Sequence, residues 1–559
     1  MKALIIWPKF DSFSFWHFEK VCELVGAKYM TPPLGLLTVG ALLPQDWDLR
    51  LVDENVRDLT EEDLAWADLM LVGAKIAHRK RAFEVIARGK AAGLPVAVGG
   101  PDPTLSSQFY KDSGADFLVL NEGELTIPMW LADMANGATS GTYETDELAD
   151  LSKTPVPRFD LVNHRDYLYV GVQYSRGCPY HCEFCNVIDL FHNKYRTKTL
   201  EQVLAEFQCL YDLGYRGQLD FFDDNLVGHI KQAKPFLRGI AKWGKEHGWP
   251  FMHSTSVTLN VARDPELLDL LREARFKALL IGIETPDEDA LRAAKKQQNL
   301  GFSIAEATDA IYRRAGASVH SGFLLGMDGE PDDIRAQIIS CIDATSVPWV
   351  MPSVVYPLPE TGLAKRLEKE GRLFPKARVT VSAEVRDQIS AGIMFETSRS
   401  PLAIVEDLLA IMKHSFDAKN YFSRVASVSA RLNTIPVLMP SLYLLKRNVR
   451  AFLRLSWAMT SNGETRRPFW SAFWKTLFRN PRGIEGLATL SILYVHFLSI
   501  LPFCYEQLEL QRDEIKAEGD EAWIARNLAE VVEAPCPKSA APAAVFSPPA
   551  PDPRPAASA

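Results

Sequence analysis

The chain has 559 residues, of which 47% are hydrophobic and 24% are charged, and its formal net charge at pH 7 is −8. These are ordinary globular values, so most of the chain is neither disordered nor fibrous, and its length predicts three or more domains. The acidic total argues against a dedicated nucleic-acid-binding protein. Eight cysteines are too few for a disulfide scaffold, and the first residues lack the apolar stretch of a secretory signal. We therefore expect a protein of the reducing cytoplasm, where clustered thiols serve as metal ligands or catalytic groups.

Residues 1–137 alternate short apolar runs with helical patterns, which predicts a doubly wound, Rossmann-like parallel α/β sheet. The apolar runs are 2–7, 49–53, 69–74, 95–100 and 117–120, with a helix pattern at 79–93. Ligands of such sheets bind beyond the carboxyl ends of the strands. No G-x-G-x-x-G follows the first run, so we do not expect a dinucleotide. The loops at that edge contain Pro33, Leu34, Gly35, Asp53, Asn55, Gly73, Gly99, Gly100, Pro101, Glu122, Gly123 and Glu124.

This ordered set of loops resembles the cobalamin-binding domain that begins many radical S-adenosylmethionine (SAM) enzymes. The resemblance implies that the twelve loop residues contact cobalamin. The D-x-H-x-x-G sequence, whose histidine ligates cobalt in many methylcobalamin-dependent synthases and mutases, is absent. The lower face of cobalt is therefore expected to lack a histidine from that sequence. His78 lies near a strand end, where a single loop histidine is more often solvated.

Residues 174–187 read YSRGCPYHCEFCNV, with Cys178, Cys182 and Cys185 spaced C-x3-C-x2-C on a loop after an apolar run. A structural zinc site usually has four ligands, and only His181, inside the loop, is at hand as a fourth. An accidental cluster would leave reactive thiols exposed. Three thiolates could instead hold a 4Fe–4S cluster with one iron free to chelate SAM.

This spacing, with Phe184 before the third cysteine, resembles the signature of the radical SAM superfamily. The resemblance implies that Phe184 lies near the adenine of SAM. The six apolar runs 169–177, 218–225, 250–257, 278–285, 317–327 and 349–357 alternate with helices, which predicts a partial (β/α)6 barrel. Polar and glycine residues of these runs resemble the SAM-binding motifs of the superfamily and are Asp223, Asn225, Ser254, Gly282, Glu284, Gly322 and Gly326. The segment 295–299 also looks familiar from this group, although a solvated helix end explains it equally well.

Residues 419–482 contain twelve basic residues and one acidic residue, Glu464, interleaved with aromatic residues. Such a segment suits either an anionic membrane surface or a helical cap with a solvated basic face, and a nucleic-acid surface ranks below both. Residues 486–505 carry no formal charge. Their length nearly suffices to span a bilayer, but Ser491, His496 and Pro502 favour a buried helix.

These features together predict a cobalamin-dependent radical SAM enzyme with domains at 1–137 (cobalamin) and 166–375 (barrel), joined by a linker at 138–165. A helical extension at 376–530 resembles that of hopanoid methylases, and a Pro/Ala-rich disordered tail follows at 531–559. The family usually methylates an unactivated carbon: cleavage of SAM at the reduced cluster gives a 5′-deoxyadenosyl radical, and methylcobalamin supplies the methyl group.

The resemblance implies a hydrophobic substrate such as a hopanoid or other lipid, and an electron donor such as flavodoxin or ferredoxin. The basic segment adds peripheral contact with the inner face of the membrane through 419–505. No nucleic-acid partner is expected. Two alternatives stay open: a radical SAM enzyme that cyclises or rearranges its substrate without methyl transfer, and a non-catalytic cobalamin and iron–sulfur sensor.

Overall fold

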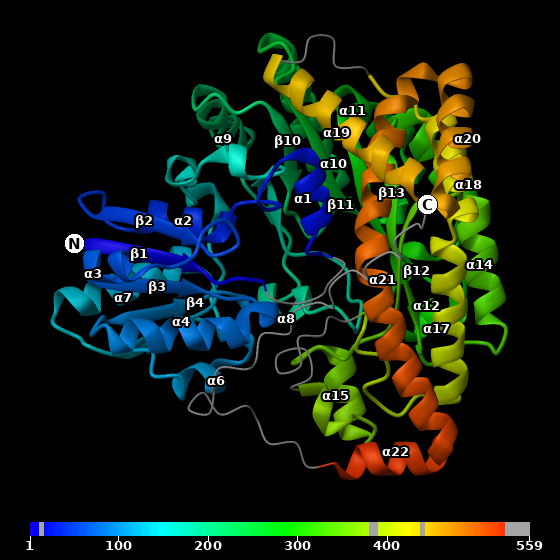
Figure 1. Cartoon of the computed structure of the whole chain (residues 1–559). Coiled ribbons are helices and arrows are strands. Elements are labelled where there is room, and N and C mark those ends of the chain that lie inside the picture. The colour runs from blue at the N-terminus through cyan, green and yellow to red at the C-terminus, as the bar shows by residue number, and fades with distance from the viewer. Residues whose placement is uncertain (11–15, 379–388, 436–441, 531–559) are drawn as a thin grey trace, which may run out of the picture.

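A computed structural model describes residues 1–10, 16–378, 389–435 and 442–530. The predicted disordered tail at 531–559 lies outside these residues. In Figure 1 the N-terminal sheet lies beside the barrel, and the C-terminal helices cover the far side of the barrel. The predicted fold class, a Rossmann-like sheet followed by a partial barrel and helices, is confirmed.

The N-terminal sheet has six parallel strands in the order β2-β1-β3-β4-β5-β6. They are β1 (Lys2–Trp7), β2 (Asp48–Asp53), β3 (Leu69–Gly73), β4 (Val96–Gly99), β5 (Phe117–Val119) and β6 (Gly141–Tyr143). Buried clusters pack on both faces, as the all-apolar strands require. The intervening helices are α2 (Leu34–Leu42), α3 (Glu61–Trp66), α4 (Arg79–Ala91), α5 (Pro101–Leu105), α6 (Ser107–Lys111) and α7 (Gly123–Ala135).

Strand β6 lies inside the segment predicted as a linker. It pairs with β5 from Phe117↔Gly141 to Val119↔Tyr143 and completes the sheet. Three residues are too few to show a strand periodicity, so the sequence pattern did not reveal it.

Helix α1 (Glu19–Val25) leaves the N-terminal sheet and packs beside the barrel (Figure 1). The preceding Phe18 stacks on His496 at 4.7 Å between ring centroids and contacts Trp349 at 5.4 Å. After α1, the backbone amide of Lys28 donates to the Asp166 carbonyl at 2.7 Å. The N-terminal chain is thus interleaved with the barrel and the C-terminal helices.

The barrel sheet is also parallel, in the order β7-β10-β11-β12-β13-β14. Its strands are β7 (Val170–Val172), β10 (Gly217–Phe221), β11 (Phe251–Val257), β12 (Phe276–Glu284), β13 (Ser318–Leu325) and β14 (Trp349–Val354). The helices that connect or follow them are α9 (Leu200–Asp212), α10 (Ile230–Glu246), α11 (Pro265–Glu273), α12 (Glu288–Ala293), α13 (Ile304–Ala310), α14 (Ile334–Thr345) and α15 (Gly362–Lys369). A short antiparallel pair, β8 (Ser175–Arg176) and β9 (Arg196–Thr197), flanks α8 (Val187–Phe191) after β7.

Alternating side chains of the barrel strands face the helices and the interior. In β12, Leu279, Ile281 and Ile283 belong to the large core under the helices. Ala278 and Gly282 alternate with them and, being small, leave room for a ligand, whereas Leu280 packs against the edge of the same core.

The C-terminal region is helical: α17 (Pro401–Phe416), α18 (Ala418–Arg431), α19 (Leu442–Ser461), α20 (Gly463–Arg479), α21 (Ile484–Glu518) and α22 (Asp520–Ala529). The segment Pro481–Glu518 is long and apolar enough to cross a membrane, but 56% of its most apolar window is buried inside the protein. It packs against α1, α17 and α18, which fits the prediction of a buried helix.

Candidate functional site

The three clustered cysteines lie on the loop between β8 and α8, where the first barrel strand ends. Gly177 begins this loop with φ +83°, and a Cβ there would approach the Lys194 carbonyl oxygen to 2.1 Å, so only glycine fits. The Asp224 carboxylate accepts from the Gly177 amide at 2.8 Å. In the middle of the loop, Glu183 donates its backbone N–H to the Ala294 carbonyl at 3.1 Å and accepts from the Leu363 amide at 2.8 Å. The loop is therefore fixed by the second, fourth and sixth β/α units.

Two side-chain amides point at the sulfurs. The Gln298 Nε2 donates to the Cys182 Sγ at 3.2 Å, and the Asn225 Nδ2 lies 3.9 Å from the Cys178 Sγ. The Oε1 of Gln298 and the Oδ1 of Asn225 are buried and have no partner. Burial raises the pKa of Cys185 to about 12 and also raises that of Cys178. Without a bound metal these thiols would keep their protons, whereas coordination to a metal removes the proton.

The donor set fits an iron–sulfur cluster. Within the described residues, no three or more His, Cys, Asp or Glu side chains gather so that they could hold one metal ion. In a 4Fe–4S cluster each thiolate binds a different iron, so the sulfurs do not need to meet at one point. Three cysteines on a rigid loop, with amide donors beside two of them, suit such a cluster with one open iron.

Glu284 and Lys296 form a buried ion pair at 2.5 Å beside the cysteine loop. Glu284 ends β12 with φ +65°, where the pairing with β13 shifts register. A Cβ on Gly282 would come within 2.1 Å of the Glu284 Oε1, and one on Gly322 within 3.5 Å of the Oε2. Gly282 therefore makes the space that the carboxylate occupies, Gly322 lies beside it, and the structure brings these three predicted residues together.

The segment 295–299 is not a solvated helix end. Lys296, Gln298 and Asn299 are buried, and the Asn299 Nδ2 donates to the carbonyls of Gly282 and Ile283 at 2.8 and 3.0 Å. Lys296 and Gln298 are the site residues that the sequence reasoning did not single out. The only sequence signal for these two residues was that the short polar segment 295–299 looks familiar from radical SAM enzymes.

Phe184 and Gly326 line one small hollow between the cysteine loop and the last two strands. Met327, Val355 and Phe395 complete its apolar wall. Arg366 at its rim pairs with Glu183 at 2.6 Å, which ties the hollow to the cysteine loop.

Asp223 and Ser254 have partners within the protein. The Asp223 carboxylate accepts from the Tyr174 and Ser175 amides at 2.9 and 2.7 Å, and burial raises its pKa to about 7. Ser254 lies three residues before the end of β11, where its hydroxyl donates to Asp220 and accepts from Gln218. The structure thus gives Asp223 a role in fixing the chain before the cysteine loop, and it sets Ser254 deep in the barrel.

Four glycines of the N-terminal loops differ in how much space surrounds them. A Cβ on Gly73 would meet Leu36, one on Gly99 the Val119 carbonyl and one on Gly100 the Ala74 carbonyl, all within 2.8 Å. These three are required by the packing of the sheet itself. Gly35 has nothing within 4 Å of a Cβ and could approach a ligand. Pro33 and Leu34 begin α2 beside it, Pro101 begins α5, and Gly123 begins α7.

His78 is buried, not solvated. Burial lowers its pKa to about 3, and its ring packs on Trp7 at 4.4 Å. Its Nδ1 accepts from the Lys75 backbone amide at 3.2 Å, and its Nε2 is buried without a partner. An unpaired buried donor at the ligand edge of the sheet is the feature of this domain that fits a bound polar cofactor.

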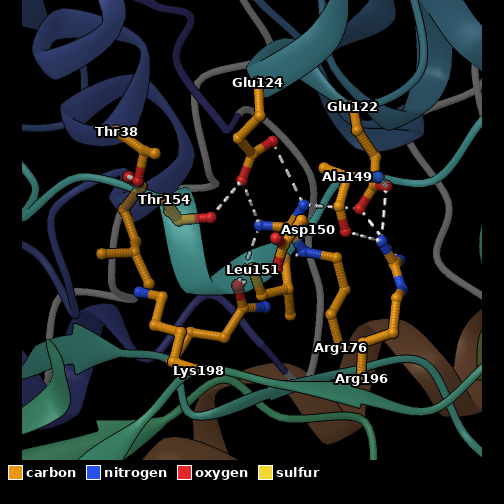
Figure 2. Close-up of polar contacts among 12 residues, drawn as sticks. Thr38, Glu122, Glu124, Ala149, Asp150, Leu151, Thr154, Arg176, Arg196 and Lys198 are labelled. Carbon is orange, nitrogen blue, oxygen red and sulfur yellow. Dashed lines mark hydrogen bonds and ion pairs between the residues drawn. The ribbon is translucent and has the colours of Figure 1, made fainter. Parts of the chain in front are cut away.

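The acidic loop residues face the barrel domain. Figure 2 shows Glu122 between Arg176 and Arg196, with ion pairs of 2.6 and 2.7 Å, and Glu124 on Arg176 at 2.9 Å. Burial alone would raise the pKa of Glu122. The two guanidinium groups outweigh that effect and hold this pKa below its usual range.

Asp53 similarly accepts from the Tyr167 hydroxyl at 3.1 Å and from the Asn55 amide at 2.9 Å. These carboxylates therefore bind the two domains together at the edge where the cofactor was predicted.

The sequence matches the radical SAM superfamily over residues 172–342 and a domain of unknown function, DUF4070, over residues 361–509. An uncharacterized methyltransferase of Synechocystis sp. is 36% identical over 502 residues, which are 89% of this chain and 91% of that protein. The hopanoid C-2 methylase of Rhodopseudomonas palustris is 31% identical over 507 residues, or 89% of this chain and 93% of the methylase.

Two solved structures share the fold. The radical SAM methyltransferase TsrM from Kitasatospora setae, with cobalamin and a 4Fe–4S cluster bound, superposes with a TM-score of 0.57 at 16% identity, covering 81% of this chain and 99% of TsrM. OxsB, a cobalamin-dependent SAM radical enzyme with aqua-cobalamin and SAM bound, gives 0.55 at 13% identity, covering 94% of this chain and 83% of OxsB. At these identities the likeness is one of fold.

Proposed function

This chain belongs to the family of radical SAM methyltransferases that includes the hopanoid C-2 methylase, and from that premise we propose that it is a cobalamin-dependent enzyme that methylates an unactivated carbon of a hydrophobic substrate. The substrate class is a hopanoid or another lipid. The three-cysteine loop, at the barrel edge that faces the N-terminal sheet, carries this proposal. Bound at that junction, the cluster and SAM supply radical chemistry and cobalamin supplies the methyl group.

The protein's own residues bind, orient and exclude water. Cys178, Cys182 and Cys185 hold the cluster, and Gln298 donates to the sulfur of Cys182. Glu284 faces the amino group of SAM, and its ion pair with Lys296 holds the carboxylate in place inside the barrel.

Phe184 and Gly326 contact the adenine beside the cluster. In the N-terminal domain Gly35 and the Nε2–H of His78 contact cobalamin. Because the Nδ1 of His78 accepts a backbone hydrogen bond, the neutral ring carries its proton on Nε2, which suits a donor and not a cobalt ligand. No protein acid or base is required.

The proposal includes a cytoplasmic location, with flavodoxin or ferredoxin as the electron donor and peripheral contact with the inner face of the membrane. A second outcome, cyclisation or rearrangement without methyl transfer, is supported by a 25% identical relative of Synechocystis sp. named anaerobic magnesium-protoporphyrin IX monomethyl ester cyclase, which matches 48% of this chain.

Anaerobic purification with cobalamin supplied tests the proposal. The expected result is a cobalamin and iron–sulfur visible spectrum, 5′-deoxyadenosine formation with dithionite and SAM, and a deuterated methyl group from labelled SAM in the product. Cys182→Ala should lose the cluster and SAM cleavage while it still binds cobalamin, and Cys209→Ala, at a dispersed thiol, should keep all three. A product without the deuterated methyl group would favour cyclisation or rearrangement. Failure to form 5′-deoxyadenosine would favour a non-catalytic sensor.

A further inference from the structure

Helices α19 and α20 present large apolar side chains to solvent. Among the described residues, eight of the thirteen exposed large hydrophobic side chains belong to these two helices: Leu442, Tyr443, Leu445, Val449, Leu453, Trp457, Trp474 and Phe478. Trp457 is 77% exposed and Phe478 is 81% exposed. Such a concentration on one surface of a soluble fold marks a contact site.

The helical spacing shows that α19 has two opposite apolar faces. Ala451, Leu455 and Met459 are buried and recur every four residues. Val449, Leu453 and Trp457 have the same spacing, offset by two residues, so they lie about 200° around the helix. One face packs on the protein, and the other meets no partner among the residues that the structure describes.

Helix α20 extends the exposed face. Its buried face contains Phe469, Ala472 and Thr476, whereas Trp474 and Phe478 stack on one another at 6.1 Å on its exposed side. The two helices pack together through Phe452 and Phe473, whose rings lie 5.9 Å apart. We call the exposed side chains of α19 and α20 the α19/α20 face.

Positive charge surrounds this face. Lys446 and Arg450 lie within the same arc of α19 as Leu453, and Arg467, Lys475 and Arg479 are exposed on α20. Arg431 of the preceding helix pairs with Asp309 at 2.9 Å, but no ion pair between described residues involves a basic side chain of α19 or α20. Their charge is therefore available to an external anion.

We infer that the α19/α20 face docks on the surface of an anionic lipid bilayer. Its aromatic and aliphatic side chains would enter the boundary between headgroups and acyl chains, and its basic side chains would meet the lipid phosphates. A two-fold contact between copies of this chain would set like charges against each other. A nucleic acid offers no partner for the Val449–Leu453–Trp457 stripe. Helix α21 is the core of the helical region and does not enter the membrane.

The α19/α20 face connects to the barrel through α1. The Arg454 Nη1 donates to the carbonyls of Glu23 and Leu24 at 2.9 and 3.3 Å, at the end of α1. Phe18, before α1, contacts Trp349 at the start of the last barrel strand. Docking would thus bring the barrel close to the bilayer that dissolves a hydrophobic substrate. This deepens the proposed function, yet the docking itself does not depend on methyl transfer.

Co-sedimentation of the full chain with vesicles tests the inference. Vesicles of phosphatidylcholine with phosphatidylglycerol should bind the chain at low salt, and vesicles of phosphatidylcholine alone should bind it weakly. L453S/W457S should abolish binding. In K446E/R450E, the loss of each positive charge should lower the affinity for the vesicles about fivefold. L510S and K80E, at exposed positions outside the face, should bind as the wild type does.

Thermal unfolding of each variant verifies that it is folded, which is expected because the substituted side chains are exposed. Absence of binding at low salt, or wild-type binding by L453S/W457S, would overturn the inference. So would a wild-type dimer that this variant dissociates without any vesicle binding. Methyl transfer to a detergent-dispersed substrate, measured in the same samples, separates failure of docking from failure of the proposed chemistry.

Discussion

The side-chain amide of Gln298 donates to the sulfur of Cys182 across 3.2 Å, although 116 positions separate the two residues. A hydrogen bond to a cluster sulfur favours the more negative, reduced state, because it stabilises charge on the sulfur. One such bond is worth about 0.5–1.5 kcal/mol, which for one electron corresponds to about 20–60 mV.

Gln298→Leu should therefore keep the cluster but lower its reduction potential by about 20–60 mV. An anaerobic redox titration followed by electron paramagnetic resonance measures the shift. Gln108→Leu, at an exposed amide of the N-terminal domain, is the matched control and should leave the potential unchanged. A potential equal to or above that of the wild type would show that the amide does not act on the cluster.

Sequence patterns located the mostly apolar strands, such as β1 and β3, because burial on both faces leaves a continuous run. They also identified the cysteine loop, whose spacing is local. They did not reveal Gln298 as the partner of Cys182, or Arg176 and Arg196 as the partners of Glu122. Such pairs form only when the chain closes over long separations, and no periodicity in one segment encodes them.

Gly282→Ala should disrupt SAM binding and spare the cluster. The new methyl group would lie within 2.1 Å of the Glu284 carboxylate and 2.6 Å of the Lys296 ammonium, so the ion pair must move. We expect at least about a tenfold loss of SAM affinity, equivalent to about 1.4 kcal/mol, by equilibrium binding. Gly463→Ala, where a Cβ meets nothing within 4 Å, should bind SAM normally. Unchanged affinity in Gly282→Ala would remove Glu284 from the SAM site.

Glu122→Ala should destabilise the junction between the N-terminal sheet and the barrel, because it leaves the partly buried Arg176 and Arg196 with one carboxylate fewer. Because both guanidinium groups are partly exposed and keep another partner, we expect a loss of about 1–3 kcal/mol in the free energy of unfolding, measured by urea denaturation. Glu61→Ala removes an exposed pair with Arg88 and should cost less than about 1 kcal/mol. Equal effects of the two variants would contradict the assigned role.

The same junction should weaken in acid. The pKa values of Glu122 and Glu124 are held below the ordinary value of 4.5, so the unfolded chain binds their protons more readily. Their stabilising contribution is complete well above pH 4.5 and is lost as the pH falls through the lowered folded values. Limited proteolysis between residues 138 and 165 at decreasing pH should show earlier cleavage, and Glu122→Ala should remove most of that dependence.

Glu330 should make stability depend on pH in the opposite direction to Glu122 and Glu124. Its Oε2 accepts from the Gly326 amide at 2.9 Å, its Oε1 is buried without a partner, and burial raises its pKa to about 7. The folded chain therefore holds this proton more tightly than the unfolded chain, and stability falls as the pH rises from about 4.5 to about 7.

Glu330→Gln keeps an acceptor for Gly326 and removes the buried charge. It should raise the free energy of unfolding by up to about 3 kcal/mol at pH 8 and by less than about 1 kcal/mol at pH 5. Denaturation at both pH values measures the difference, and a gain that is equal at pH 5 and pH 8 would show that Glu330 does not titrate as its burial requires.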